Sequence, residues 1–589
     1  MKRLSNLIGS LLGLLALGAL AFALVLAFGG LPRGTITSSE VFQSPIKPTR
    51  SRSQVLLSPL EPPPQSPTPQ PPTFPAVTSI PVPTVTPIMT PTPLPPIAWN
   101  PLPACENRPQ GLAAWRQYVA SRNSDPAIGR QLDAYLRQVR PMSAALRDVG
   151  LETLPSLLDV TDTAPQTEVI RRELTVLWLN VTSGRLNRAT EVNLSALPGV
   201  HTVGDLLTEM ERALAEGNAS GALLGASKQL LAGQGASRSV CAQLLHLQIG
   251  NNIHEITWSG AGLDKRLKLA QPNSADFPWS MGRLIPSPDY RWVAIETTGY
   301  ERAGPVYLLN SGTGKLTKLN PVSALGEGRT LTYDDLLAWE VYGWHPNSQH
   351  LLIGPATSGY VAWVDLQSNT FQTILAAMGG RDVIDLSPDG NGFVYVTGTA
   401  DNDRNQRLDY YDLRSRQITT LFTFPFSEGA LYFPRFSPTG NSVAYLTEKG
   451  HPTTGLTQTI RVFDLNTKTS KVLIEGALSH TEPVWSPDGQ MIAFAWKDSV
   501  LPNGHWSPEN ETWRGNIWIV HVPSGKAQQV TFVKGAAHRP VWSLDGRFLA
   551  FLTHDGQIGL TTLERPDVIW QVSAGSSNWP AFTSMVFVP

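Results

Sequence analysis

The segment Pro483–Phe494 has the sequence PVWSPDGQMIAF. It predicts two short apolar strands joined by a tight turn at Pro487-Asp488-Gly489. Proline presets φ at the first central position of a turn, and a glycine just after it accepts a positive φ. Short apolar runs bounded by turn residues are typical of a β-hairpin.

The same pattern occurs six times in the second half of the chain. The motif serines, or the histidine that replaces one of them, are Ser287, His345, Ser387, Ser437, Ser486 and Ser543. Each copy is followed by a second predicted hairpin, such as TIRVFDLNTKTSKVLI at 459–474. One repeat therefore comprises four strands in about 40–45 residues plus insertions, which is the spacing of a propeller blade.

The W-S-P-D-G turn and the hairpin after it resemble the TolB-type (WD40-like) β-propeller repeat. The resemblance covers residues 251–589 and implies an all-β propeller with a central channel. The segments 251–269 and 578–588 match half a repeat each, so together they predict one composite blade that closes the ring. We therefore expect seven blades; six remain an alternative, because the composite blade lacks the Pro-Asp-Gly turn.

An uncharged apolar run extends from Leu7 to Phe28, and Lys2 and Arg3 precede it. As a helix, this run would be about 33 Å long, which is enough to cross a membrane. The sequence predicts a retained signal anchor, because the apolar region of a cleavable signal peptide, the alternative, is shorter. The basic residues predict that residues 1–6 are cytoplasmic and that the rest of the chain is extracytoplasmic.

Two further regions separate this run from the propeller. Residues 41–103 are rich in proline, threonine and serine, which predicts a disordered linker. Residues 104–250 contain segments with apolar residues at helical spacing, which predicts a small all-α domain. We expect its terminal cysteines, Cys105 and Cys241, to form a disulfide in an exported chain; two separate buried thiols are the alternative.

Composition and motifs argue against several classes of function. The formal charge of −1 and the pI of about 6.8 give no sign of a nucleic-acid surface. The 589 residues contain no G-x-S-x-G nucleophile motif, no HExxH and no Cys/His cluster. Asp401, Asp403, Asn405 and Asp412 partly match a calcium loop, but a solvated hairpin loop explains them better. We therefore expect no metal, no cofactor and no catalytic residue.

The resemblance implies that ligands bind where the segments leading into the first hairpins gather, which we call the channel mouth. Aromatic, arginine and histidine side chains, frequent in binding hot spots, occur in these segments, although packing between blades is the alternative role for each. The candidates are Trp279, Arg283, Trp339, Tyr342, Arg381, Asp382, Tyr432, Arg435, His480, Glu482, His538, Arg539 and Trp579. A second candidate is the insertion 497–516, with His505, Trp506 and Trp513.

The sequence therefore predicts a membrane-anchored propeller that binds a protein or an envelope component without catalysis. One alternative is a propeller enzyme, a hydrolase or lyase of glycans, with acids such as Glu340, Asp382 and Glu482 at the channel mouth. Another is a purely architectural envelope protein. Fold resemblance alone does not decide between them.

Overall fold

The computed structural model describes residues 108–248, 252–259, 262–267, 280–298, 304–319, 322–323, 339–355, 360–376, 384–398, 405–451, 455–476, 482–497, 515–533, 537–553, 557–565, 569–573 and 584–589. The predicted anchor and linker lie outside these residues. Among the helices that the structure describes, none is long and apolar enough to cross a membrane. The segment Ile88–Pro589 forms one compact unit.

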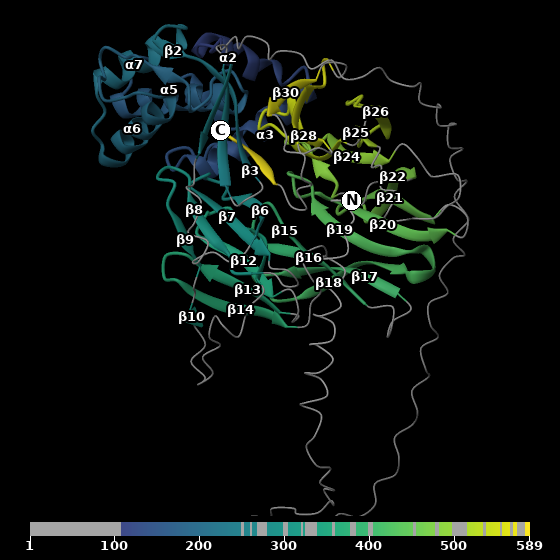
Figure 1. Cartoon of the computed structure of the whole chain (residues 1–589). Helices are drawn as coiled ribbons and strands as arrows, with labels where there is room; N and C mark the ends of the chain where they lie inside the picture. Colours follow the sequence, from purple (N-terminus) through teal and green to yellow (C-terminus); the bar gives the residue numbers. More distant parts are fainter. Residues whose placement is uncertain are drawn as a thin grey trace, which may run out of the picture. The chain divides into compact units, whose positions relative to one another are not determined.

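The first described region is helical, as predicted (Figure 1). Its helices are α2 (Leu112–Ser121), α3 (Pro126–Met142), α4 (Leu154–Leu158), α5 (Gln166–Thr182), α6 (Val203–Glu216) and α7 (Gly221–Leu231), with short strands β1 (Glu191–Val192) and β2 (Ala236–Arg238). Helix α6 begins at a capping box in which the Thr202 and Asp205 side chains each bond the other's backbone N–H. It ends at Gly217, whose φ of 69° suits glycine.

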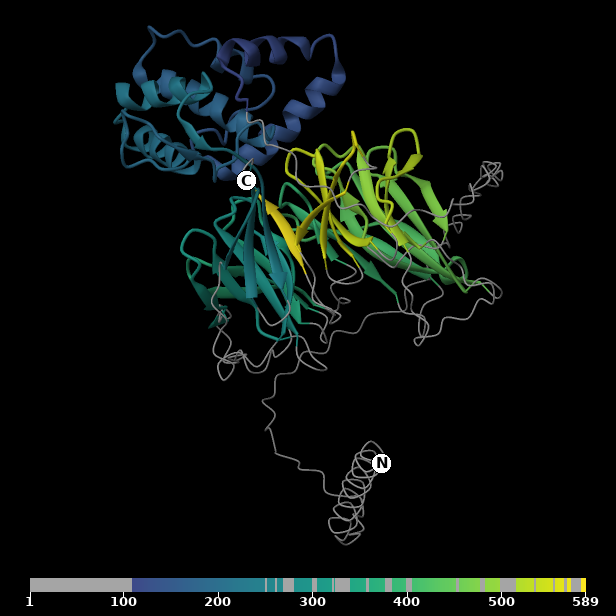
Figure 2. The same ribbon diagram turned by 45° about the horizontal axis from the view of Figure 1, so that its top comes forward.

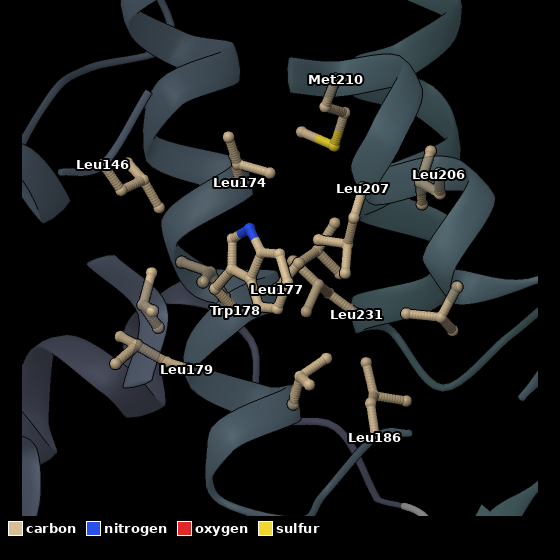
Figure 3. Packing of buried hydrophobic residues seen from close by; sticks show 14 of the residues in the cluster. Leu146, Leu174, Leu177, Trp178, Leu179, Leu186, Leu206, Leu207, Met210 and Leu231 are labelled. Carbon is tan, nitrogen blue, oxygen red and sulfur yellow. The ribbon is translucent and has the colours of Figure 1, made fainter. Parts of the chain in front are cut away.

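Helix α5 is the centre of this region, because its side chains are buried on almost every face. Figure 3 shows Leu174, Leu177 and Trp178 of α5 packed among leucines of the surrounding elements and Met210 of α6. Burying large apolar side chains in this way supplies the main stabilisation of the helical region.

The remaining described strands form seven sheets, each of them a blade. In blades 1 to 6 four strands follow the chain order from the inside outward, whereas blade 7 has the last strand of the chain first. Blade 1 comprises β6 (Ser280–Pro286), β7 (Trp292–Thr298), β8 (Tyr307–Asn310) and β9 (Leu316–Lys318). Blade 2 comprises β11 (Trp339–Trp344), β12 (His350–Pro355), β13 (Tyr360–Asp365) and β14 (Thr370–Ala376), with β10 (Val322–Ser323) added outside β14. Blade 3 comprises β15 (Ile384–Leu386), β16 (Gly392–Thr397), β17 (Asn405–Asp412) and β18 (Ile418–Pro425), followed by a 3-10 turn at Phe426–Glu428.

Blades 4 to 6 follow the same order along the chain (Figure 1). Blade 4 comprises β19 (Ala430–Phe436), β20 (Ser442–His451), β21 (Gly455–Asp464) and β22 (Thr469–Gly476). Blade 5 comprises β23 (Val484–Trp485), β24 (Met491–Lys497), β25 (Gly515–His521) and β26 (Lys526–Gln529). Blade 6 comprises β27 (Ala537–Trp542), β28 (Phe548–Thr553), β29 (Ile558–Thr562) and β30 (Trp570–Ser573).

Blade 7 joins the two ends of the propeller segment, which confirms the predicted composite blade. Its strands are β31 (Met585–Val588), β3 (Val240–Gln248), β4 (Asn252–Ser259) and β5 (Gly262–Leu267). Strand β31 pairs with β3 in antiparallel register, with Leu244 opposite Phe587; Figure 2 shows the yellow β31 beside teal strands. Pairing the two ends closes the ring and removes two exposed strand edges.

The hydrophobic cores confirm seven blades, because each of seven apolar clusters joins two neighbouring blades. Blade 7 shares one cluster with blade 6, through residues such as Trp258 and Trp570. It shares another with blade 1, through Leu245 and Val293. The ring is therefore packed continuously across its closure.

One predicted boundary differs from the structure. The propeller begins at Val240 with β3, whereas the helical domain was expected to extend to residue 250. The apolar spacing of Leu244, Leu245 and Leu247 is compatible with a helix as well as a strand, so a short run of this kind is ambiguous. Cys241 on β3 is disulfide-bonded. Cys105 lies outside the described residues, and its pairing with Cys241 remains a prediction.

The motif serine makes two hydrogen bonds that hold the repeated turn together. In blade 5, the Ser486 hydroxyl donates to Asp488 at 2.6 Å and accepts from the Met491 backbone N–H at 2.9 Å. The same pair of bonds occurs at Ser287, Ser387 and Ser543. The motif serine is buried in each case, so it satisfies a backbone donor that the turn would otherwise leave unpaired.

The motif tryptophans connect neighbouring blades. The indole N–H of Trp542 donates to the Val484 carbonyl at 3.1 Å, and that of Trp485 donates to the Arg435 carbonyl at 3.1 Å. Trp344 bonds the Ile285 carbonyl at 2.9 Å in the same way. Each bond runs from the first strand of one blade to that of the preceding blade, so the repeat encodes packing around the ring.

Candidate functional site

The first strands of the blades line the axis of the ring, since they contact the first strands of adjacent blades. Five charged residues from four blades meet there, and we call them the axial charge cluster. They are Arg283 of β6, Glu296 of β7, Asp385 of β15, Arg435 of β19 and Glu482, which lies two residues before β23. Glu482 thus belongs to the start of blade 5, Arg435 to blade 4 and Asp385 to blade 3.

The blade 1 side of the cluster is a two-pronged ion pair. Arg283 Nε and Nη2 donate to the two Glu296 carboxylate oxygens at 2.8 and 3.0 Å. Nη2 also donates to the Val341 carbonyl at 2.7 Å, and the Val341 N–H donates back to Glu296 at 2.8 Å. Glu296 is 3% exposed and Arg283 is 29% exposed, so only the arginine reaches solvent.

The opposite side of the cluster is centred on Glu482. Its carboxylate lies 3.0 Å from Arg435 Nη2 and 3.8 Å from Arg283 Nη1, and it is 39% exposed. Arg435 also donates to the Ile384 carbonyl at 3.2 Å. The backbone N–H of Phe436 donates to Asp385 at 2.7 Å. Glu482 therefore connects the two arginines of the cluster.

Strand irregularities help to place these side chains. The register shifts between Met281 and Leu284 in β6, and between Tyr432 and Arg435 in β19. Such β-bulges reorient side chains relative to a regular strand. Arg283 lies within the first bulge, and Arg435 follows the second.

Burial and charge tune the ionisation of the cluster. Burial raises the pKa of Asp385 to about 6, although Arg435 and the Phe436 N–H favour its charged form. Burial disfavours the charge of Arg283, but Glu296 outweighs this effect and raises the pKa of the arginine. The pKa of Arg435 is raised in the same way, with Glu482 and Asp385 outweighing its burial. The cluster thus holds two cations and two or three anions, depending on Asp385.

A cavity of about 980 Å³ lies between α3 and the repeated turns at the other end of the first strands. Tyr342 and Asp385 line it, so they belong to both the cavity and the inner surface of the ring. Hydrogen bonds hold the helical region at these turns: Gln138 Nε2 donates to the Leu544 carbonyl at 2.8 Å, and Arg547 Nη2 donates to the Gly184 carbonyl at 2.8 Å.

The structure brings three of the predicted mouth residues together, namely Arg283, Arg435 and Glu482. The others within the described residues are dispersed. Tyr342 is 8% exposed and packs between blades 2 and 3, and Tyr432 packs against a core cluster, beside Phe433. Trp339 begins β11, while His538 is half-buried and Arg539 exposed on β27.

Several predicted residues lie outside the described part of the chain. These are Trp279, Arg381, Asp382, His480 and Trp579 of the mouth set, His505, Trp506 and Trp513 of the insertion, and Asp401 and Asp403 of the acidic loop. The remaining oxygens of that loop have local roles: the Asp412 carboxylate accepts the backbone N–H and the hydroxyl of Ser415 within its turn.

The sequence reasoning missed Glu296 and Asp385, although both leave a signal in the repeats. Nine residues after the motif position, where Glu296 lies, the other copies have Gly354, Val396, Leu446, Ala495 and Leu552. Two residues before it, Asp385 and Arg435 are the charged members of a set that otherwise has Ile285, Gly343, Val484 and Val541. A charge among apolar equivalents indicates a buried polar network.

Comparison with known proteins gives limited overlaps. No protein-family model matches the chain. It is 26% identical over 224 residues to dipeptidyl-peptidase 5 of Porphyromonas gingivalis, covering 37% of this chain and 31% of that protein. It is 25% identical over 114 residues to the uncharacterized peptidase YuxL of Bacillus subtilis, covering 19% of this chain and 16% of that protein. The chain thus spans less than a third of either relative.

Solved structures with a similar arrangement include the tricorn protease, at 15% identity and a TM-score of 0.38 over 57% of this chain and 35% of that one. A putative TolB from Agrobacterium tumefaciens has 16% identity and a TM-score of 0.32, and the match covers 47% of this chain and 94% of that one. TolB from Acinetobacter baumannii has 13% identity and a TM-score of 0.31, and the match covers 62% of this chain and 85% of that one.

The strand order itself defines the class of this protein. It is a seven-bladed β-propeller with a preceding helical region, closed by a blade made from both ends of the propeller segment. TolB proteins are among its structural neighbours, and two peptidases are distant partial relatives.

Proposed function

We propose that this protein is a non-catalytic binding module that recognises a charged segment of a protein or envelope component at the axial charge cluster. The observation that carries the proposal is the arrangement of Arg283, Arg435 and Glu482: three charges from three blades that converge on the axis and keep part of their surface accessible to solvent.

The energetics of the cluster favour a binding role over an architectural one. A buried or half-buried ion pair contributes little net stability, because desolvation offsets the attraction between the charges. Apolar side chains at these positions would hold the ring together at least as well. Glu482 keeps 39% of its side-chain surface exposed, so a partner that reaches the axis can contact this side chain. Arginines in such settings are frequent binding hot spots.

The ligand chemistry follows from the two signs of charge. Arg435 and Arg283 suit a carboxylate or another planar anion, which arginine binds through paired donors. Glu482 suits a lysine or arginine of the partner. A protein segment with both signs of charge matches the cluster better than a uniformly charged polymer does.

Catalysis is the second candidate, because Asp385 has a pKa of about 6 and lies in the electrostatic field of Glu482. A carboxylic acid with a raised pKa beside a carboxylate is the pairing that glycosidases use. This candidate predicts turnover of a glycan that Asp385→Asn abolishes. Peptidase activity, which the names of the two partial relatives suggest, would require a nucleophile that the sequence motifs do not provide.

We further propose that Leu7–Phe28 anchors the protein in the membrane and that the propeller is extracytoplasmic. The 22-residue uncharged run and the basic residues before it support this placement. The proline-rich segment 41–103 would then separate the propeller from the membrane surface.

The test is capture of a partner from native envelopes by the unit Ile88–Pro589, which contains the helical core and all seven inter-blade cores. The variant Glu482→Gln removes the exposed charge of the cluster. The matched control is Glu428→Gln, because Glu428 is exposed on the 3-10 turn that precedes β19 and is not a member of the cluster.

A partner that the parent and Glu428→Gln capture, and that Glu482→Gln loses, would support the proposal. Equal capture by all three would move the site to another surface. Glycan turnover that depends on Asp385 would replace the binding role with the catalytic one, and no capture together with no turnover would favour an architectural protein.

A further inference from the structure

The cavity of about 980 Å³ beneath α3 shares Asp385 with the axial charge cluster, but the repeated turns and the helical region form most of its wall. Its volume is at the upper end of the range typical of small-molecule sites, about 300–1,000 Å³. Hydrogen bonds from Gln138 and Arg547 join the two regions beside it, so the cavity belongs to one compact unit.

The propeller side of the cavity has a continuous row of apolar residues among its polar ones. The turn prolines of five consecutive blades line it: Pro288, Pro346, Pro388, Pro438 and Pro487. Leu544 takes the corresponding position in blade 6, and Tyr342 and Trp344 also line the cavity. The residues that shape each turn therefore also create a curved apolar wall, against which a chain or ring of carbon atoms would be removed from water.

The helical side carries three arginines, namely Arg137 and Arg140 of α3 and Arg147 beyond its end. Arg137 is paired with Asp133 of the same helix. Arg140 donates through Nε to the Val149 carbonyl at 2.9 Å. Within the described ranges, neither Arg140 nor Arg147 makes an ion pair with a carboxylate, and Arg147 is exposed. Two guanidinium groups are thus available to an anion.

The carboxylates of the cavity wall do not neutralise these arginines. Asp389 accepts the Ser387 hydroxyl at 2.6 Å and the Asn391 backbone N–H at 3.0 Å, so it is committed to its own turn. Asp385 accepts from Phe436 and lies in the field of Arg435, on the side of the axis. The positive charge of the cavity therefore lies on its helical wall, and the apolar surface lies on its propeller wall.

A further polar atom lies in the wall of the cavity. Gln138 lines it, and its Oε1 is buried without a hydrogen-bond partner among the described residues. Its amide orientation is determined, since Nε2 donates to the Leu544 carbonyl. An unsatisfied buried acceptor costs about 1–3 kcal/mol, which a water molecule that enters with the ligand would recover, because a carboxylate head has no donor of its own.

From this division of charge and apolar surface, we infer that the cavity binds a small amphipathic acid: a chain or ring of carbon atoms with one anionic head. The carbon body lies against the turn prolines and Trp344, and the head pairs with Arg140 and Arg147. This inference does not depend on the partner site at the axial charge cluster.

The test is calorimetric titration of the unit Ile88–Pro589 with three probes below any micelle-forming concentration. Decanoate has both the apolar body and the anionic head, decanol has the body alone, and acetate has the head alone. We expect saturable binding of decanoate, with decanol and acetate at least about tenfold weaker, because a charge-assisted hydrogen bond and the burial of the chain each contribute that much.

The variant Arg147→Glu should weaken decanoate binding by at least about tenfold. The control Arg130→Glu makes the same change at an exposed position of α3 that does not line the cavity, and it should bind as the parent does. If circular dichroism shows that Arg147→Glu is misfolded, Arg147→Gln replaces it. The inference is overturned if the parent does not saturate with decanoate, if decanol or acetate binds as tightly, or if the Arg147 and Arg130 variants behave alike.

Discussion

Arg435 Nη2 lies 3.0 Å from Oε2 of Glu482, although the two residues belong to different blades. Glu482 also approaches Arg283 of blade 1 at 3.8 Å, so one carboxylate connects side chains from three blades across the axis. Such a contact depends on the closed ring, because residues 283 and 482 are brought together only when the blades are arranged around one axis. Several measurable consequences follow from this geometry.

Arg283→Ala should lower the free energy of unfolding by about 3–5 kcal/mol, because Glu296 would keep a buried and uncompensated charge. Glu482→Gln should cost no more than about 1 kcal/mol, since Glu482 is partly exposed. Urea unfolding followed by tryptophan fluorescence measures both variants. Equal costs would mean that Glu296 is not held in the buried pair described here.

The pKa of Asp385 predicts a pH dependence of stability. Between about pH 4 and pH 6 the unfolded chain has released this proton whereas the folded protein retains it, so stability falls as the pH rises through this window. Asp385→Asn has no proton to release there. Its stability relative to the parent should therefore rise from pH 4 to pH 7, by up to about 3 kcal/mol. Parallel pH profiles for the two proteins would contradict the raised pKa.

Ser486→Ala should destabilise the protein by about 1–3 kcal/mol, because it leaves the partly buried Met491 N–H without the acceptor that the buried Ser486 hydroxyl provides. Hydrogen exchange at Met491 should accelerate more than exchange in distant blades. The control is Ser368→Ala in an exposed turn of blade 2, which should change stability by less than about 0.5 kcal/mol. A similar effect of both substitutions would show that the motif serine has no special role.

Trp542→Phe should cost about 1–3 kcal/mol in hydrogen bonding alone, since the Val484 carbonyl loses its donor from the neighbouring blade. Trp518→Phe is the matched comparison, because the buried indole nitrogen of Trp518 has no hydrogen-bond partner in the described structure. It should be the milder substitution. Thermal unfolding of the two variants side by side measures the difference, and the reverse order would contradict the inter-blade bond.

Much of the fold could be predicted from the sequence, because the structure of each repeat depends on interactions between residues that are close in sequence. The Ser-Pro-Asp-Gly turn and the strands around it are formed by residues close in sequence, and two half-repeats were enough to predict blade 7. The predicted start of that blade was wrong, because the spacing of the apolar residues around Leu244 fits a helix as well as a strand. Its correct pairing with Phe587 depends on a contact between distant parts of the chain.

The candidate site could be predicted only in part, for the same physical reason. Arg283, Arg435 and Glu482 were expected near one mouth, but their mutual contacts depend on bulges and on ring closure. Arg140 and Arg147 resemble the solvated face of an ordinary helical domain in the sequence. Only the packing of α3 against the repeated turns gives these arginines an apolar wall to face.

The most direct test of partner binding at the axial charge cluster is carboxyl footprinting of the unit Ile88–Pro589. The carboxylates are labelled with a carbodiimide and glycinamide, with and without the captured envelope partner. Mass spectrometry then compares labelling at Glu482, which is 39% exposed, with labelling at the exposed Glu428. We expect the partner to suppress labelling at Glu482 and to leave labelling at Glu428 unchanged. Undiminished labelling of Glu482 in the complex would contradict binding at the axial charge cluster.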